Sequence, residues 1–325
     1  MRFHVAALFA CLAVCSTAVL SQGSTPAAAA AGFPTKPLRL VVSDVAGSPA
    51  ESVARTLVPR LAASLGQPVA IELRSDAAQA VAHAAPDGYT LLLAGPTLAI
   101  DSAVRVPPPA DAQKDFAAVS LVAIFPYVMI ATAKMNLDSV QDVVAIAKAS
   151  PGRIAYASPG PGSGGHLAGE LFKSSTSVHL RHAPLKGPAE VLAELAAGRA
   201  QVAFVPIAAA QPLLKARTAK ALAVTGRSRV PALPDVPTMT EAGVPGFDLT
   251  GWLGVLAPAG TGKSIVERLN ADVRKALLVP DARERIAAAV SGEAVSSSPE
   301  AFRDLVRRDV TGWSRLAREM NIRLE

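Results

Sequence analysis

Short apolar runs alternate with longer helical patterns along the chain after Gly32. The short runs are rich in Val, Ile and Leu and have the length of strands, whereas the segments between them repeat apolar residues every three or four positions. Nine strands are predicted, at residues 38–42, 69–72, 89–94, 127–132, 154–157, 178–182, 202–205, 221–225 and 252–257. Strands that alternate with helices are typical of parallel βαβ units, so the pattern predicts an α/β fold.

Capping chemistry predicts where the helices begin. Ser48 offers a capping side chain, Pro49 suits the first helical position, and Glu51 follows the cap by three residues. The buried stripe of this helix is predicted to be Val53, Leu57, Leu61 and Leu65. Further helices are predicted at residues 138–148, 188–197, 264–278 and 299–320. Proline-rich stretches at 106–109 and 230–237 suit lobe junctions or long surface crossings.

The first 31 residues differ from the rest of the chain. Arg2 is their only Lys, Arg, Asp or Glu, residues 5–20 are apolar, and an alanine tract follows. This pattern predicts a signal peptide over residues 1–31, cleaved after an Ala-x-Ala type site, and therefore export to the periplasm. A membrane anchor is disfavoured because the apolar run is shorter than the roughly 20 residues that span a bilayer.

Both cysteines, Cys11 and Cys15, lie within the apolar run. Cleavage would leave a mature chain without a thiol, so neither a disulfide nor a Cys-ligated metal is expected. Lipid anchoring through one of these cysteines stays open, although Phe9 and Val14 fit the small-residue requirement of a lipidation site badly.

The formal net charge is +6, and loss of Arg2 leaves +5. Only 4% of the residues are aromatic and no basic run is interleaved with aromatic residues. Nucleic-acid binding is therefore not expected. A mild positive field would instead help to attract an anionic ligand.

Residues 160–165 satisfy the spacing G-x-G-x-x-G between a predicted strand and an apparent helix that begins near His166. A dinucleotide site would need an acidic residue at the end of the next strand, and residues 178–184 contain none. Glycines at a helix N-terminus also leave backbone N–H groups uncovered, which makes an anion site without a charged side chain. A carboxylate would fit such a site.

Residues 257–264 resemble a phosphate-binding loop with Ala257 at the place of its first glycine. A nucleotide triphosphatase would also need a strand that ends in a magnesium-binding Asp, and none is found. The segment is predicted to be a strand-to-helix turn with Ser264 near the cap.

Neither a metal site nor a nucleophile is indicated. The histidines after residue 31, at positions 83, 166, 179 and 182, show no H-x-H or H-x-x-x-H spacing. Ser163 lacks the G-x-S-x-G elbow of a serine hydrolase because Pro161 holds the place of its first glycine. No enzymatic activity and no cofactor are expected.

Several segments together resemble one family, in order along the chain. They include KPLRLVV at 36–42, APDGYTLL at 85–92, KDFAAVSL at 114–121, GHLAGELF at 165–172, LAVT at 222–225, PALPDVPT at 231–238, EAGVPGF at 241–247 and LAPAGT at 256–261. These stretches are similar to the substrate-binding proteins of tripartite tricarboxylate transporters, the Bug family. The match covers essentially the whole chain after the leader.

The resemblance implies a two-lobe, periplasmic-binding-protein-like (Venus flytrap) fold, each lobe a mainly parallel sheet flanked by helices. Residues 33–126 and 251–325 are expected to form lobe 1, and residues 127–250 lobe 2. It also implies that a small mono-, di- or tricarboxylate is held in the cleft by backbone groups and ordered water. The implied partners are transporter subunits in the membrane, and the chain is expected to be a monomer.

Two loops that face each other across the cleft would bind the ligand, the first before Pro49 and the second after the strand at 154–157. The expected ligand-binding residues are Ser43, Asp44, Gly47, Ser48, Thr97, Ser158, Gly160, Gly162, Ser163, His166 and Lys186.

The chain departs from the family pattern at the cleft. Asp44 lies in a first loop where the family has Pro and Gly, and Arg74 begins a shortened segment after the second strand. Leu185 replaces a Tyr, and Val205 with Pro206 replaces an Asp. These changes leave open which carboxylate binds.

Two other functions stay open from the sequence. A ligand-loaded binding protein can dock on a membrane sensor and act in signalling, and the glycine motifs leave a nucleotide-binding enzyme as a third hypothesis.

Overall fold

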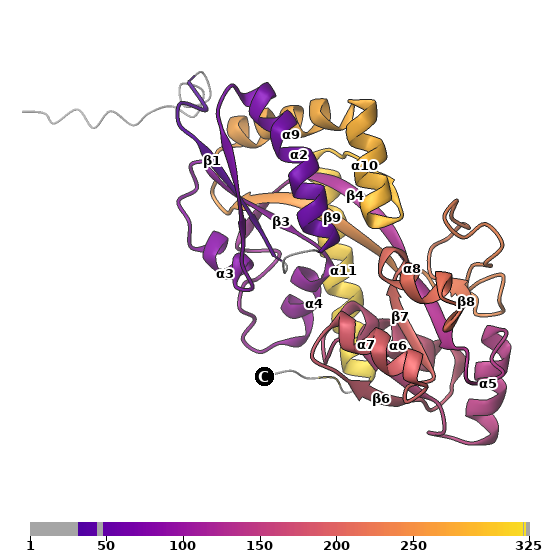
Figure 1. Ribbon diagram of the computed structural model, residues 1–325. Helices are drawn as coiled ribbons and strands as arrows, with labels where there is room; N and C mark the ends of the chain where they lie inside the picture. Colours follow the sequence, from indigo (N-terminus) through magenta and orange to yellow (C-terminus); the bar gives the residue numbers. More distant parts are fainter. Residues whose placement is uncertain (1–31, 44–47, 321, 323–325) are drawn as a thin grey trace, which may run out of the picture.

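The protein is described by a computed structural model over residues 32–43, 48–320 and 322 (Figure 1). The strands in this part of the chain are β1 (Leu38–Val42), β2 (Val69–Leu73), β3 (Thr90–Ala94), β4 (Phe116–Thr132), β5 (Ala155–Ser158), β6 (Arg181–Pro184), β7 (Val202–Pro206), β8 (Ala219–Val224), β9 (Thr250–Pro258) and β10 (Glu293–Ala294). The helices are α2 (Pro49–Leu65), α3 (Ala77–Ala82), α4 (Pro96–Val104), α5 (Val140–Ala149), α6 (Gly164–Thr176), α7 (Pro188–Ala197), α8 (Ile207–Lys215), α9 (Lys263–Leu277), α10 (Pro280–Val290) and α11 (Pro299–Glu319).

The long strand β4 belongs to both halves of the sheet. Its first part pairs with β9 and β10, and its second part pairs with β7 and β8. The main partner changes between Pro126, which lies opposite Thr250 of β9, and Tyr127, which lies opposite Pro206 of β7. The first half therefore runs β2-β1-β3-β9-β4, and the second half continues β4-β7-β5-β6.

Strand direction brings the functional ends of both halves together. β3 is antiparallel to β9, which is antiparallel to β4, so β3 and its parallel neighbour β1 run along β4 toward the second half. β7 is antiparallel to β4, so β7 and its parallel neighbour β5 run back toward the first half. The carboxyl ends of β1, β3, β5 and β7 therefore point to the junction of the halves, where ligands bind in open α/β sheets.

Helices cover both faces of the first half. The apolar stripe predicted on α2 is buried, since Val53 and Leu57 have no exposed surface and Leu61 and Leu65 are 1% and 6% exposed. This stripe packs on the strand face that carries Leu38 and Leu40. Each such side chain stabilises the fold by roughly 1.5–3 kcal/mol on burial.

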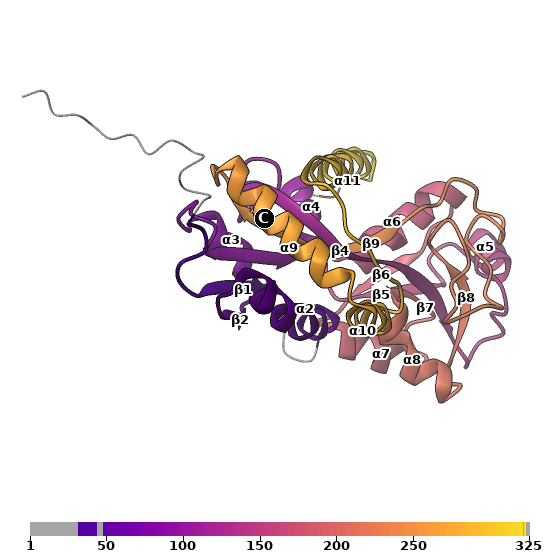
Figure 2. The ribbon, with the colours of Figure 1, turned by 90° about the horizontal axis from the view of Figure 1, so that it is seen from above.

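α11 lies beside α4 on one side of the sheet, whereas α2 and α10 lie on the other (Figure 2). A small cluster formed by Ile100 and Val104 of α4, Leu167 of α6 and Ala317 of α11 is fully buried or nearly so. Because α6 belongs to the second half, this cluster joins the two halves on the α11 side.

The predicted elements agree with the structure at most places and differ at a few. The helix predicted at 188–197 is α7, but the strand predicted at 178–182 begins only at Arg181. The first part of β4, from Phe116 to Pro126, was not predicted, and neither were α3, α4, α8, α10 and β10.

The predicted signal peptide, residues 1–31, lies outside the described residues. No helix in the described part is long and apolar enough to span a bilayer. The predicted lobe boundaries at 126/127 and 250/251 stay a prediction, and the change of partner along β4 is the observation that supports them.

Candidate functional site

Helices α2, α4, α6 and α8 begin at the junction of the two halves because each follows one of the strands that end there. Ser48 is the N-cap of α2, with its Oγ accepting a hydrogen bond from the Glu51 amide at 3.2 Å. Ser163 caps α6 in the same way, through the His166 amide at 3.2 Å. Ser43 directly follows β1, whereas Asp44 and Gly47 lie outside the described residues.

Two predicted residues of the junction are exposed to solvent. Thr97 is the second residue of α4 and follows Pro96, which begins the helix. Lys186 lies just before Gly187, the N-cap of α7, and its side chain is exposed. The backbone amide of Lys186 donates to a carboxylate oxygen of Glu190 at 2.8 Å.

The second loop, residues 158–163, uses most of its own polar groups internally. The Ser163 hydroxyl donates to the Gly160 carbonyl oxygen at 2.7 Å while accepting from His166. The Gly160 amide donates to Ser158 Oγ at 3.2 Å, and the Gly162 amide donates to His166 Nδ1 at 3.1 Å. Gly160 and Gly162 have φ values of 116° and 78°, which favour glycine. The donors predicted at Gly160, Gly162 and Ser163 are thus engaged within the loop.

The first two amides of α6 remain uncommitted. The N–H groups of Gly164 and Gly165 have no backbone or side-chain acceptor within the described part of the chain. A Cβ atom at Gly164 would collide with the hydroxyl of Tyr127, and one at Gly165 would lie 2.7 Å from the Phe204 carbonyl oxygen. Glycine is therefore needed at both positions. The half-buried Gly164 and the buried Gly165 both keep an N–H without an acceptor among the described residues at a helix N-terminus, where anions are favoured.

Tyr127 was not among the predicted ligand-binding residues. It lies in β4 at the change of partner, and its hydroxyl is next to Gly164 at the start of α6. This hydroxyl makes no hydrogen bond to any described residue, whereas the Tyr127 amide is bound by Thr225 Oγ1 at 2.8 Å. Burial raises the pKa of Tyr127 to about 12, so the hydroxyl keeps its proton at neutral pH. The only signal in the sequence is an aromatic residue at the start of a predicted strand.

A cavity of about 60 Å³ opens beside Tyr127 and Gly164. Its other lining residues come from α4, from the segment before β9 and the start of β9, and from α11: Pro96, Ile100, Asp248, Leu249, Thr250, Gly251, Asp309 and Trp313. Burial raises the pKa of Asp309, whose carboxylate accepts from Trp252 Nε1 at 2.7 Å. At about 30 Å³ per water molecule, the cavity has room for one or two waters or a small polar group between the halves.

A larger hollow, of about 660 Å³, lies on the second half and shares Asp248 with the small cavity. Its two arginines are neutralised by acidic neighbours, Arg227 by Asp248 at 2.6 Å and Arg229 by Glu241 at 3.0 Å. None of the predicted ligand-binding residues lines it. The hollow therefore offers a ligand no unpaired cation among its two arginines, whereas the junction offers donors without an acceptor in the described part of the chain.

The start of α2 differs from the start of α6 in its charge. Glu51, in the first turn, is 8% exposed, and its carboxylate accepts from Arg55 Nε at 2.9 Å. A carboxylate in the first turn already satisfies the positive end of a helix dipole. The first residue of α2 is Pro49, which has no N–H to offer a ligand.

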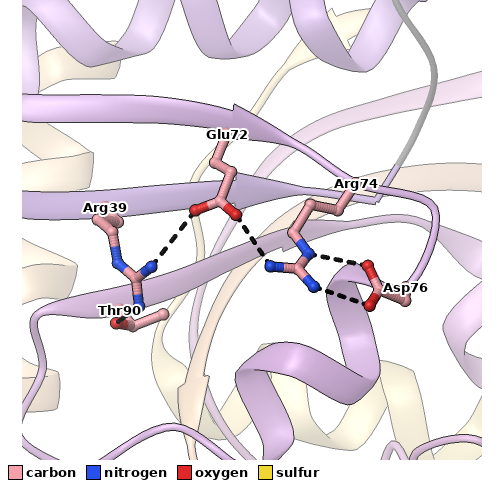
Figure 3. A network of polar contacts seen from close by, with 5 residues as sticks. All are labelled: Arg39, Glu72, Arg74, Asp76 and Thr90. Carbon is pink, nitrogen blue, oxygen red and sulfur yellow. Dashed lines mark hydrogen bonds and ion pairs between the residues drawn. The ribbon is translucent and has the colours of Figure 1, made fainter.

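The shortened segment after β2 forms a polar network with its neighbouring strands (Figure 3). Arg74 donates through two nitrogens to Asp76, at 2.8 Å each, and reaches Glu72 at 3.1 Å. Arg39 joins Glu72 and Thr90, at 3.4 Å and 3.1 Å. The hydrogen bonds from Arg74 lower the pKa of Asp76. Arg74 is therefore committed to these carboxylates.

The segment that resembles a phosphate-binding loop lies far from the junction. β9 runs opposite to β3, so its carboxyl end at Pro258 is at the other edge of the first half. The turn is closed by Thr261, whose hydroxyl donates to the Pro258 carbonyl oxygen at 2.7 Å. The predicted strand-to-helix turn is present, but α9 is capped by Gly262, and Ser264 is its second residue.

No group of three or more His, Cys, Asp or Glu side chains in the described ranges is arranged to hold a metal ion. Two histidines of the second half, His166 and His182, lie in a polar cluster beneath the loop 158–163. The rings of His166 and His182 stack at 4.4 Å between centroids, and His182 stacks on Tyr156 at 4.8 Å.

The sequence and the fold were compared with those of known proteins. The family model of the tripartite tricarboxylate transporter family receptor, TctC, matches residues 53–322. Protein BugT of Bordetella pertussis is 31% identical over 97% of this chain and 98% of its own length. Among solved structures, Rpa4515 of R. palustris with adipate is 32% identical and has a TM-score of 0.80, covering 90% of this chain and 99% of its own.

The periplasmic binding protein BugD is 28% identical, with a TM-score of 0.77 over 90% of this chain and 100% of its own. The predicted two-lobe α/β fold and the predicted family are thereby confirmed. The chain belongs to the receptor family of the tripartite tricarboxylate transporters.

Proposed function

We propose that this protein is an exported solute-binding protein that holds a small organic carboxylate between its two lobes and presents it to a tripartite tricarboxylate-type transporter. The observation that carries the proposal is the convergence of uncommitted donors at the start of α6. There, the amides of Gly164 and Gly165 and the hydroxyl of Tyr127 lie together where the strands of both halves end. The adipate bound by Rpa4515, a relative at 32% identity, supports the class of ligand.

The physical basis is hydrogen bonding to an anion without a neighbouring positive charge. Two backbone amides at a helix N-terminus and one protonated hydroxyl can each donate to a carboxylate oxygen. The exposed side chains of Thr97 and Lys186 would serve a second polar or charged end of the ligand. Because Thr97 belongs to lobe 1 and the other donors belong to lobe 2, a carboxylate that contacts both would stabilise the closed arrangement over an open one.

The remaining predictions from the sequence complete this proposal. Residues 1–31 would direct export and be removed, residues 33–126 with 251–325 would form lobe 1, and residues 127–250 lobe 2. Asp44 and Gly47 would complete the first loop. The mature protein would act as a monomer in the periplasm, without enzymatic activity.

Thermal unfolding of the mature chain with a panel of small molecules tests the proposal. Adipate, shorter and longer dicarboxylates, tricarboxylates, monocarboxylates and amino acids are compared with ATP and NAD. A ligand present at 100 times its Kd stabilises the folded state by about 2.7 kcal/mol. We expect a rise in Tm with at least one carboxylate and none with the nucleotides. A rise with ATP or NAD alone would contradict the proposal.

A further inference from the structure

Two histidine rings lie directly beneath the second loop and share its hydrogen bonds. His166, on the first turn of α6, is 6% exposed, and its Nδ1 accepts from the Gly162 amide at 3.1 Å. His182, on β6, contacts the Ser158 hydroxyl through Nε2 at 2.7 Å. Both ends of the loop, at Ser158 and at Gly162, are therefore held by imidazole nitrogens.

The hydrogen bond from Gly162 fixes the state of the His166 ring. An amide N–H can only donate, so Nδ1 must carry a lone pair and the ring must be neutral with its proton on Nε2. A proton on Nδ1 would place two donors against each other at this short distance. The loop conformation seen here therefore requires an uncharged His166.

The contact between His182 and Ser158 can form with either protonation state of the His182 ring. Ser158 Oγ accepts from the Gly160 amide and lies 3.2 Å from the Gly160 carbonyl oxygen, so its hydrogen can point to that oxygen or to His182. The 2.7 Å contact favours donation to a neutral His182. Protonation of His182 would reverse this bond and place a charge 4.4 Å, between ring centroids, from His166.

The charged groups that face the two rings shift the histidine pKa values in opposite directions. Glu170 and Lys173, both on α6, form an ion pair at 2.8 Å, and Tyr156 of β5 donates to the same Glu170 carboxylate. Burial, the largest cause, lowers the pKa of His166 below 6.5, and burial together with the neighbouring His166 lowers the pKa of His182 to about 4. Glu170 raises both values and Lys173 lowers them. Both rings are therefore neutral at pH 7.

We propose that His166 and His182 are positioning residues that hold the loop 158–163 in its binding conformation, and that the bond from Gly162 requires an uncharged His166 ring, which makes the loop a pH-sensitive part of the carboxylate site. The loop leads directly into the amides of Gly164 and Gly165, so a change in the loop conformation would displace the donors of the site. The consequence for ligand binding depends on the function proposed above, whereas the state of the loop can be measured without a ligand.

The direction of the pH effect follows from the sign of the shift. A histidine whose pKa is lower in the folded protein than in the unfolded chain takes up protons on unfolding, so its contribution to stability is present above the unfolded value near 6.5. That contribution is lost as the pH falls from about 6.5 toward the value of about 4 for His182. Protection of the loop should decrease over the same interval.

Hydrogen exchange of the Gly162 amide in the ligand-free mature protein tests the proposal. The protection factor is measured by NMR between pH 7.5 and pH 4, together with the ¹⁵N shifts of the His166 ring. We expect an unprotonated Nδ1 and a protected amide at pH 7.5, and a loss of protection of about tenfold as the ring is protonated. An Nδ1 that carries the proton at pH 7.5, or protection that does not change with pH, would overturn the proposal.

Two substitutions separate the hydrogen bond from the packing of the ring. His166→Phe keeps an aromatic ring against His182 but removes the acceptor, so the Gly162 amide should lose about tenfold protection at every pH. His166→Asn restores an acceptor oxygen at the position of Nδ1 and cannot be protonated in this range, so it should regain protection without the loss in acid. Parallel loss in wild type and in H166N would count against the proposal. Thermal unfolding of both variants confirms that they are folded, and the wild-type titration does not depend on either.

Adipate binding at pH 7.5 and pH 5.0 links the loop to the site when wild type is compared with H166N. The second carboxyl of adipate is partly protonated at pH 5.0, and this ligand effect is the same for both proteins. Wild type should bind more weakly at the lower pH, and H166N should show a smaller loss. Equal losses would overturn the link to binding. If no carboxylate binds at either pH, the proposed function fails while the exchange measurement still decides the role of His166.

Discussion

Helices α2 and α6 begin with nearly identical caps but offer very different surfaces to a ligand. Ser48 and Ser163 both have φ of −74°, with ψ of 158° and 157°, and both accept a hydrogen bond from the amide three residues on. After the cap, α2 continues with Pro49 and the buried Glu51, whereas α6 continues with two glycines and no acidic residue in its first turn.

This difference teaches that a cap by itself does not make an anion site. The α2 start contains its own negative charge and lacks one amide donor, so its dipole is largely satisfied within the helix. The α6 start has two free amides beside the Tyr127 hydroxyl. The residues that follow the cap, and not the capping serine, therefore decide which helix can accept a carboxylate.

The largest effect is expected when the same negative charge is placed at the first residue of each helix. Gly164→Asp adds a carboxylate at the α6 start and a Cβ atom that collides with Tyr127. We expect carboxylate affinity to fall at least 100-fold, measured by isothermal titration calorimetry. Pro49→Asp is the matched change on α2, and it should alter Kd less than threefold because Glu51 already lies there. Equal losses in both variants would show that the two helix starts contribute alike.

Removal of the Tyr127 hydroxyl tests how much one donor at the α6 start contributes to carboxylate affinity. Tyr127→Phe deletes a donor beside Gly164 and should weaken carboxylate binding about fivefold to tenfold, since a net hydrogen bond contributes about 1 kcal/mol. Tyr89→Phe is the control, because the Tyr89 hydroxyl binds the Thr35 amide at the opposite end of β3. Wild-type affinity in both variants would contradict a role for the Tyr127 hydroxyl in binding the carboxylate.

Neutralising the α2 charge should have a smaller effect, mainly on stability. Glu51→Gln removes the ion pair with Arg55 and the charge at the helix start, which together stabilise the fold by about 1 kcal/mol. We expect Tm to fall by about 2–4 °C. Affinity for a dicarboxylate should rise by no more than a few-fold, and a loss of affinity would mean that Glu51 supports the site.

The smallest effect is expected at the network of Figure 3. Arg74→Gln removes the paired hydrogen bonds to Asp76, but these groups are exposed and screened by solvent. Both Tm and carboxylate affinity should stay within experimental error. A clear loss of affinity on calorimetry would show that Arg74 leaves Asp76 to bind the ligand.

Local chemistry accounts for the parts of the fold that could be predicted. The cap at Ser48 and the stripe from Val53 to Leu65 depend on residues within a few turns of one helix, and both are as predicted. The glycine spacing at 160–165 indicated a helix start suited to an anion, and α6 begins there. β4 was only half predicted because its partners come from distant segments, so its continuity across Pro126 has no local signal.

The sequence by itself determined the α/β class, the family, most strands and helices, and the region of the candidate site. Only the tertiary structure decided which donors in that region are free. The hydroxyl of Ser163 and the amide of Gly162 are engaged by near neighbours in the folded loop, Gly160 and His166. Ser158 meets His182, and Gly164 meets Tyr127, from other strands. The reason is physical: a hydrogen-bond donor is available to a ligand only when no protein acceptor lies within reach, and the folded conformation of the loop and its neighbours decides which acceptors do.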